Sequence, residues 1–194
     1  MLRFFSRSVP NAVPQQLYGA VMAQSREPQF YLGLGVPDTV LGRFDMVCLH
    51  VYLLSRRLAG EGAPEAIALS QAVFDAFTGG LEIALRELGV GDTSVPKRMK
   101  RMVRGFYAQI EAFGPGLDAG DAERLRIQLD ARFDEVAKAG GGPELAAYMI
   151  SAADHLAAQP FSTIAAGELT WPAVPARSAM GVVGQPAEAR NETE

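Results

Sequence analysis

The sequence has few of the residues from which metal sites and nucleophilic active sites are built. Its 194 residues include one cysteine, Cys48, and two histidines, His50 and His155. A single cysteine excludes an internal disulfide, and a zinc site needs three or four nitrogen or sulfur donors, of which this chain has three in all. We therefore predict no metal site. Cys48 lies in an apolar run, so we expect it to be a small buried side chain.

Enzyme motifs are missing as well. The sequence contains no Gly-x-Ser-x-Gly elbow, and Gly89 and Gly91 lack the preceding strand and the Gly-Lys-Ser/Thr ending of a phosphate-binding loop. Acidic pairs such as Asp134 and Glu135 are adjacent, and we interpret them as solvated helix surface rather than as acid–base catalysts. The sequence predicts neither an enzyme nor a cofactor.

Long hydrophobic runs are lacking too. The longest strongly apolar stretch, residues 46–54, has nine residues and contains His50, whereas a membrane-spanning helix needs about 20. Residues 1–8 hold two arginines and two phenylalanines but no hydrophobic signal core. We interpret residues 1–13 as a flexible N-terminus, with a short membrane-touching patch as the alternative. We expect the protein in the cytoplasm, where a lone cysteine stays reduced.

The chain does have helical periodicity along nearly its whole length. Apolar residues recur at three- and four-residue spacing and no run alternates with a period of two, so strands are not expected. The pattern predicts an all-α, single-domain, irregular bundle of about six to seven helices, at residues 14–27, 29–34, 37–58, 64–88, 95–113, 118–136 and 144–158. After Trp171 the composition turns to proline, alanine and glycine. We therefore assign residues 14–170 to the folded domain and 171–194 to a disordered tail.

Glycine and proline mark the expected ends and bends of these helices. Gly114-Pro115-Gly116 is predicted to form a turn, after which Asp118 or Asp121 caps the next helix. Gly79-Gly80 lies in the middle of the helix at 64–88. There it is expected to bend the helix or to let a neighbouring helix approach closely.

The most unusual feature is a concentration of positive charge. Five of the eight residues from Lys97 to Arg104 are basic in a chain of formal net charge −4, so the remainder of the chain carries −9. At 100° per residue, four of these five side chains fall in one arc, and apolar side chains fall on the opposite arc. We call the five residues the basic stripe: Lys97, Arg98, Lys100, Arg101 and Arg104.

The basic stripe is hard to explain as a device for stability. Ser94 is predicted to cap its helix, so cations in the first turn oppose the helix dipole. No acidic residue occurs between Asp92 and Glu111, so no ion pair can form within the helix. We predict a surface that recruits an anionic partner, the alternative being that acids from another helix neutralise the charge. Met102 and Tyr107, beside the stripe, are expected to hold an apolar part of that partner.

Several segments of the chain, taken together and in order, indicate a resemblance to known proteins. They are LYGAVMAQSR at 17–26 with FY at 30–31, GVPDT at 35–39 with GRFDM at 42–46, LHVYLL at 49–54, and LGVGD at 88–92 with VPKRMK at 95–100. Together they resemble the ubiquinol–cytochrome c chaperone family, assembly factors for the respiratory cytochrome b–c complex, over roughly residues 17–158. The compact chain is similar to a bacterial member of that family.

The resemblance implies an α-helical, non-enzymatic chaperone that holds newly made cytochrome b before or during haem insertion. Mitochondrial members bind this client with a small partner near the ribosomal tunnel exit, so the resemblance adds the ribosome to the implied partners. On this interpretation the basic stripe meets cytoplasmic loops of cytochrome b, or anionic headgroups at the inner face of the plasma membrane.

Two other functions stay open from the residues alone. A peripheral membrane module without a protein client would insert Phe4 and Phe5, with Arg3 and Arg7, beside the basic stripe. A helix-turn-helix nucleic-acid binder is the weakest alternative, because the rest of the chain is acidic and no Asn or Gln stands beside the arginines. No DNA partner is therefore expected.

Overall fold

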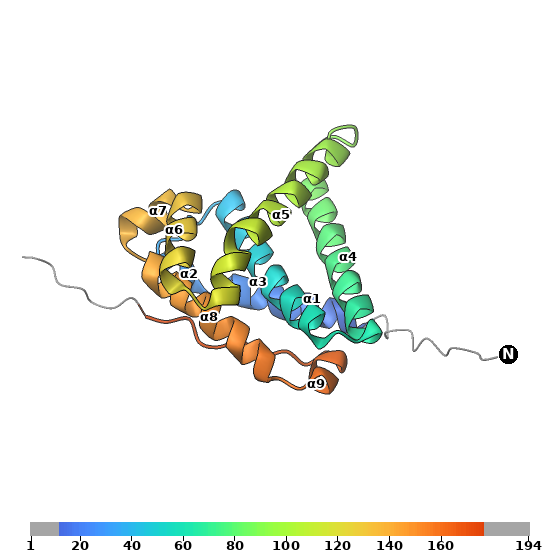
Figure 1. The fold of residues 1–194 in the computed structure, drawn as a ribbon. Coiled ribbons are helices and arrows are strands. Elements are labelled where there is room, and N and C mark those ends of the chain that lie inside the picture. The colour runs from blue at the N-terminus through green and yellow to red at the C-terminus, as the bar shows by residue number, and fades with distance from the viewer. Residues whose placement is uncertain (1–11, 177–194) are drawn as a thin grey trace, which may run out of the picture.

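The computed structural model describes residues 12–176, and this part of the chain folds into a bundle of α-helices without strands (Figure 1). The long helices are α1 (Val13–Ser25), α3 (Val40–Glu61), α4 (Pro64–Glu87), α5 (Val95–Ala119), α6 (Ala122–Arg132) and α8 (Gly142–Ala158). Three short helices connect or extend them: α2 (Pro28–Leu32), α7 (Asp134–Ala139) and α9 (Phe161–Ala165). The predicted all-α, single-bundle fold is confirmed.

Helix α3 is the centre of the core. It packs against α1, α4, α5 and α8, and every residue from Met46 to Leu54 is buried. The side-chain oxygen of Thr39 accepts a hydrogen bond from the backbone N–H of Gly42 (3.1 Å) at its start, and Gly62 ends it in the left-handed region with φ 69°. The apolar run at 46–54 is therefore a helical segment that is buried on all sides inside the bundle.

Helices α1 and α4 cross at Gly80. A Cβ atom at this position would lie 2.8 Å from the hydroxyl oxygen of Tyr18, so a larger residue here would force the Tyr18 side chain to shift. Of the glycine pair singled out in the sequence, Gly80 therefore has a close neighbour from another helix, whereas nothing lies within 4 Å of a Cβ at Gly79.

An aromatic cluster fixes α5 against α3 and α4. Phe44 of α3 stacks on Phe77 of α4 with ring centroids 6.4 Å apart, and Phe106 of α5 lies 5.7 Å from Phe77. Phe74 adds a second contact to Phe106 at 5.4 Å. Because these rings are large and mostly buried, they set where the rest of α5 lies.

The predicted turn at Gly114-Pro115-Gly116 is wrong. Helix α5 continues through Pro115 to Ala119 and ends at Gly120, which is left-handed with φ 61°. Phe113 and Leu117 are buried on either side of the proline, and Gly116 packs closely against Leu125 of α6. Tertiary packing thus outweighs the loss of one backbone hydrogen bond at the proline.

The helix predicted to run through Phe133 and Val136 is in fact two. Asp121 caps α6 by accepting a hydrogen bond from the backbone N–H of Arg124 (2.9 Å), as expected for one of the two candidate caps. Phe133 then leaves the helical region with φ −123° and ψ 85°, and α7 follows it. This break places both Phe133 and Val136 in the core.

The chain after α9 is held against the bundle as far as it is described. Trp171 lies with its ring centroid 5.0 Å from that of His50, and Val174 packs on the core. The side-chain amide of Gln24 donates to the carbonyl oxygen of Pro172 (3.2 Å). We call residues 166–176 the C-terminal strap. It differs from the prediction, in which the tail begins at 171, because composition does not register these contacts with distant residues.

The other predicted boundaries fall partly outside the described residues. Val13 opens α1 and is buried, so the predicted flexible N-terminus of 1–13 ends before it. Residues 1–11 and 177–194 lie outside the described part of the chain, and with them the phenylalanines and arginines of the proposed N-terminal patch.

Candidate binding surface

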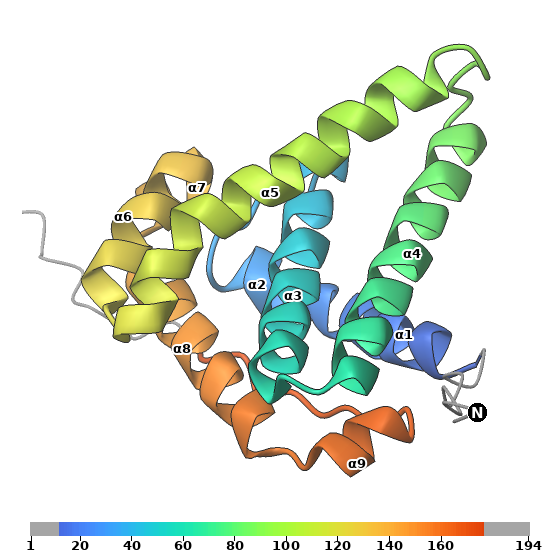
Figure 2. The same ribbon diagram turned by 45° about the vertical axis from the view of Figure 1, so that its right-hand side comes forward.

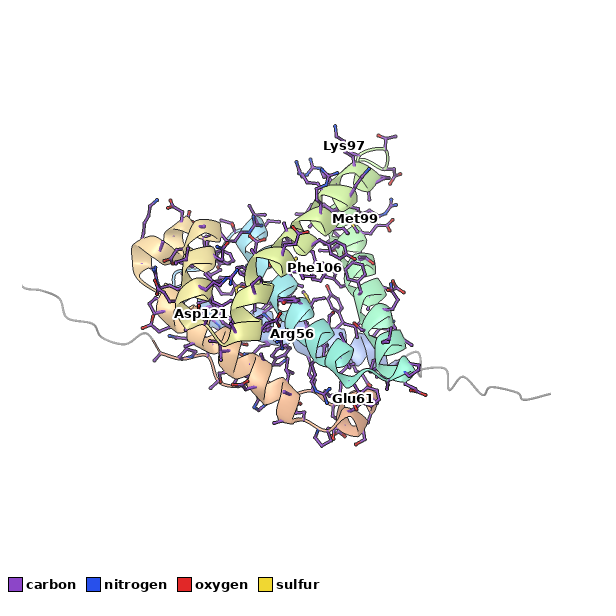
Figure 3. The ribbon with its side chains drawn as sticks, in the orientation of Figure 1. Arg56, Glu61, Lys97, Met99, Phe106 and Asp121 are labelled. Carbon is purple, nitrogen blue, oxygen red and sulfur yellow. The ribbon has the colours of Figure 1, made fainter. Side chains whose placement is uncertain are left out.

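Helices α4 and α5 form a hairpin that projects from the rest of the bundle (Figures 1 and 2). Lys97 lies near the tip of this hairpin, whereas Met99 and Phe106 lie on the side of α5 that faces α4 (Figure 3). The aromatic cluster anchors the base of the hairpin, so α5 carries the basic stripe outward from a fixed position.

The helix carrying the basic stripe is amphipathic, as predicted. All five basic side chains are exposed, while Val95 and Phe106 on the opposite arc are 3% exposed. Ser94 occupies the N-cap position, as predicted, but its side chain makes no capping hydrogen bond. The first turn of α5 therefore carries cations without a side-chain cap or an acidic residue.

The basic stripe has no ion-pair partner among the described residues, where no carboxylate oxygen lies within 4.0 Å of any of its five charged groups. Two carboxylates of the hairpin are engaged elsewhere, because Arg86 pairs with Glu82 (2.9 Å) and with Asp92. Acids from another helix therefore do not neutralise the stripe in this part of the chain.

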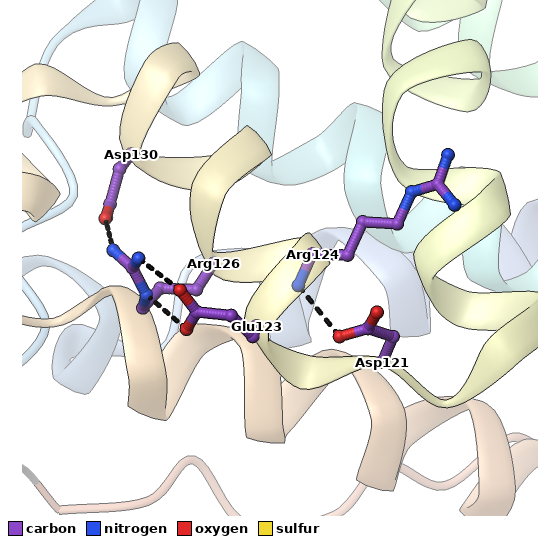
Figure 4. A network of polar contacts seen from close by, with 5 residues as sticks. All are labelled: Asp121, Glu123, Arg124, Arg126 and Asp130. Atoms are coloured by element: carbon purple, nitrogen blue, oxygen red, sulfur yellow. Dashed lines mark hydrogen bonds and ion pairs between the residues drawn. The ribbon is translucent and has the colours of Figure 1, made fainter.

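By contrast, Arg126 of helix α6 and Arg56 of helix α3 form ion pairs. Arg126 pairs with Glu123, with 2.6 Å between Nη2 and Oε1, and also with Asp130 (Figure 4). Arg56 of α3 likewise pairs with Asp118 at 2.7 Å. The basic stripe is thus set apart by having five neighbouring cations that all lack an ion-pair partner in the described residues.

A groove of about 540 Å³ opens between the start of α3, the end of α4 and the basic stripe. Six apolar side chains line it, together with three arginines and a glycine: Val40, Leu41, Phe44, Leu85, Leu88, Met102, Arg98, Arg101, Arg132 and Gly105. Three of the apolar side chains are largely exposed: Val40 (67%), Leu41 (62%) and Leu88 (62%). Neighbouring exposed aliphatic side chains make this groove a candidate binding surface.

One arginine of the groove, Arg132, is held in place by a buried carboxylate. Arg132 pairs through Nη2 with the carboxylate of Asp45, whose side chain is 4% exposed. The side-chain amide of Gln109 donates to the same Asp45 oxygen at 2.9 Å. Burial raises the pKa of Asp45, and the Arg132 guanidinium and the Gln109 hydrogen bond oppose that rise. The buried carboxylate therefore fixes where Arg132 meets the groove.

The structure brings together most, but not all, of the predicted site residues. Met102 lines the groove beside Arg98 and Arg101, whereas Lys97, Lys100 and Arg104 line an adjoining hollow of about 500 Å³. Tyr107 is 52% exposed and lies outside both, with its ring 6.3 Å from that of Phe74.

Sequence reasoning missed seven of the ten residues that line the groove: Val40, Leu41, Phe44, Leu85, Leu88, Gly105 and Arg132. The signal for Val40, Leu41 and Leu88 was available in the pattern, because each is an aliphatic residue at the very start or end of a helix. Nothing in the sequence indicates that these helix ends and Arg132 lie side by side.

A buried polar cluster lies elsewhere in the bundle, around His50. Nδ1 of His50 donates to the carbonyl oxygen of Met46 (2.7 Å), and Nε2 accepts from the hydroxyl of Tyr148 (2.8 Å). The Tyr148 oxygen in turn accepts from the side-chain amide of Gln24 (3.0 Å). Burial lowers the pKa of His50 to about 4, so this histidine is neutral at pH 7.

The single cysteine is buried. Burial raises the pKa of the Cys48 thiol well above its usual range, which leaves it inert. No group of three or more potential metal ligands occurs among residues 12–176. None of the helices described is long and apolar enough to cross a membrane.

Comparison with known proteins identifies the family. The sequence profile of the ubiquinol–cytochrome C chaperone family matches residues 33–171. The crystal structure of the Cbp3 homolog from Brucella abortus is similar with a TM-score of 0.76 and 36% sequence identity, over 84% of this chain and 90% of that chain. No curated protein sequence matches.

These similarities define the protein as an assembly chaperone and not an enzyme. The chain belongs to the ubiquinol–cytochrome c chaperone family and serves the assembly of the ubiquinol–cytochrome c reductase complex. The family predicted from the ordered sequence segments is thereby confirmed.

Proposed function

We propose that this chaperone captures newly made cytochrome b through the basic stripe and the adjoining groove, and holds it until it joins the ubiquinol–cytochrome c reductase complex. The observation that carries the proposal is the set of five exposed cations without a carboxylate partner in the described residues. They stand beside exposed aliphatic side chains, a combination that suits a client with both charged and apolar surface.

Charge attraction gives this surface a kinetic role. Unpaired cations on a projecting hairpin create a local positive potential that speeds encounter with an acidic client. The attraction weakens as added salt shortens the Debye length to about 8 Å at physiological ionic strength. The groove then supplies apolar contact, which salt does not screen. Capture is therefore expected to slow with salt more than release does.

We also propose that the protein works at the cytoplasmic face of the inner membrane. Anionic headgroups attract basic residues by about 1 kcal/mol each near the surface, so the same stripe would concentrate the chaperone where cytochrome b is inserted. A lipid-binding module without a protein client is the alternative. It predicts strong flotation with bare anionic vesicles. The ribosome, the other implied partner, stays a prediction.

The test reverses the stripe. A variant in which Lys97, Arg98, Lys100, Arg101 and Arg104 are all replaced by glutamate should have a thermal unfolding midpoint no lower than that of the native protein, because no ion pair is lost. Its co-purification with cytochrome b and the amount of assembled complex should fall at least about tenfold, since several attractive contacts become repulsive. Unchanged capture by a folded variant would refute the role of the stripe.

A matched control uses cations that stand outside the stripe. Arg26 and Arg124 are exposed, and their side chains form no ion pair in the described part of the chain. The double variant Arg26→Glu, Arg124→Glu should retain cytochrome b capture. Loss of capture in this control would mean that overall charge matters and the position of the charge does not.

A further inference from the structure

Three arginines from two helices meet at the apolar groove, and this arrangement is more specific than a patch of positive charge. Arg98 and Arg101 come from α5, and Arg132 comes from the end of α6. We propose that the groove binds a helical polypeptide segment that carries carboxylates next to an apolar face. The inference rests on the proposed function and deepens it by naming the kind of client segment.

The charge of the groove has no counterpart within it. None of its ten lining residues is acidic, and its apolar wall includes the exposed side chains of Leu41 and Leu88. A planar guanidinium binds a carboxylate through two parallel hydrogen bonds, which a lysine cannot do. Three arginines beside aliphatic side chains therefore complement a segment with acidic and apolar residues on one side.

Arg132 is placed for recognition. Asp45 pairs with Nη2 of the Arg132 guanidinium, and this ion pair holds the arginine in position. The guanidinium has five N–H donors, and the Arg132 side chain is 37% exposed where it lines the groove. Its remaining donors are thus available to a ligand at little cost in side-chain entropy.

Two features of the groove favour a helix as its occupant. The groove is walled by helices α3, α4 and α5, and the described chain has no strand edge to which an extended peptide would add. A helix satisfies its own backbone hydrogen bonds and presents side chains at three- and four-residue spacing. The exposed aliphatic side chains line a hollow, which suits an inserted segment better than a flat membrane surface.

Fluorescence anisotropy with the full-length protein tests the inference. The probe is a labelled 18-residue alanine–leucine helix with three glutamates along one edge, and two matched probes carry glutamine or lysine at those positions. The glutamate probe should bind about tenfold more tightly than the glutamine probe, as charge-assisted hydrogen bonds predict. The lysine probe should bind more weakly still.

Two variants keep the test independent of folding. Arg98→Gln with Arg101→Gln leaves Arg132 and Asp45 in place and should abolish most of the preference for glutamate. Leu88→Glu puts a negative charge on an exposed groove position and should weaken the glutamate probe most. The control Arg124→Gln should bind all three probes as the native protein does.

The outcomes separate this inference from the proposed function. Equal affinity for the three probes, or binding to phosphatidylglycerol vesicles without any preference among the probes, overturns the inference. It does so even if reversal of the basic stripe abolishes cytochrome b capture. The converse result is that the native protein prefers the glutamate probe while reversal of the basic stripe leaves cytochrome b capture intact. That combination supports the groove and refutes the proposed function.

Discussion

His50 is fully buried with both ring nitrogens in hydrogen bonds, whereas the basic stripe lies exposed without an ion pair among the described residues. The two regions use opposite chemistry within one bundle. Around His50, side chains from α1, α3 and α8 satisfy one another and close against the C-terminal strap. On the α4–α5 hairpin, charged and aliphatic side chains are left for a partner.

The difference indicates that the cluster around His50 stabilises the fold and that the hairpin is available for binding. Buried polar groups cost free energy unless they are hydrogen-bonded, so a satisfied cluster such as His50 with Tyr148 defines one arrangement of the helices. Unpaired surface cations add no such constraint, and in the first turn of a helix they are mildly unfavourable. Changes around His50 should therefore alter stability, and changes on the hairpin should alter binding.

The largest expected effect comes from truncating Phe30. This ring is fully buried, with its centroid 4.9 Å from that of Tyr148 and 5.5 Å from that of His50. Phe30→Ala should lower the free energy of unfolding by about 3–5 kcal/mol, measured by urea denaturation. Leu88→Ala, at a largely exposed position on the hairpin, should change it by less than about 0.5 kcal/mol. Similar losses in both variants would contradict the comparison.

Tyr148→Phe should have the next largest effect. It removes the hydroxyl that donates to Nε2 of His50 and so leaves this buried nitrogen unpaired, while the partly buried Gln24 amide keeps its hydrogen bond to Pro172. The expected loss is about 1–3 kcal/mol of unfolding free energy, with cytochrome b capture per folded molecule unchanged. Tyr107→Phe on the exposed hairpin is the matched control and should be neutral.

The pH dependence of stability should report His50. Burial lowers the pKa of His50 from 6.5 to about 4, so between these values the unfolded chain binds a proton that the folded chain does not. Stability from this residue is complete above pH 6.5 and falls as the pH drops, by up to about 1.4 kcal/mol per unit. Urea denaturation from pH 7 to 5 should show that the unfolding free energy changes less with pH in His50→Gln than in the native protein. Equal slopes for the native protein and His50→Gln would exclude this role.

The smallest expected effect is a gain in stability on the hairpin. Lys97 lies in the first turn of α5, where an anion interacts favourably with the helix dipole. Lys97→Glu should raise the unfolding free energy by about 0.3–1 kcal/mol at low ionic strength. Arg104→Glu, further along the same face, should show little gain because the dipole effect fades after the first turn. A destabilised Lys97→Glu would mean that the stripe has a structural role.

Local sequence was enough for most helices and failed where distant contacts decide. The ends of α3 and α4 follow from Thr39, Gly62 and Pro64, whose preferences are local. The continuation of α5 through Pro115 depends on Leu125, which reaches Gly116 from another helix. The C-terminal strap likewise depends on Trp171 meeting His50, more than a hundred residues earlier.

In the candidate site, too, local sequence was enough for some residues and not for others. Periodicity placed the basic stripe on one face of a helix because residues three and four apart share a face. The groove combines residues from 40 to 132, and no local pattern joins Val40 and Leu88 to Arg132. Sequence reasoning also placed Tyr107 with the stripe, although it lies outside the groove.

By itself, the sequence determined the all-α class, the family and the amphipathic face that carries the basic stripe, because each is encoded by neighbours along the chain. Only the tertiary structure decided that the stripe is unpaired within the described residues, and that it borders an apolar groove with a third arginine anchored on Asp45. The physical reason is that pairing, burial and cavities depend on the distances between helices. Those distances are set by the packing of Phe44, Phe77 and Phe106 across three of them.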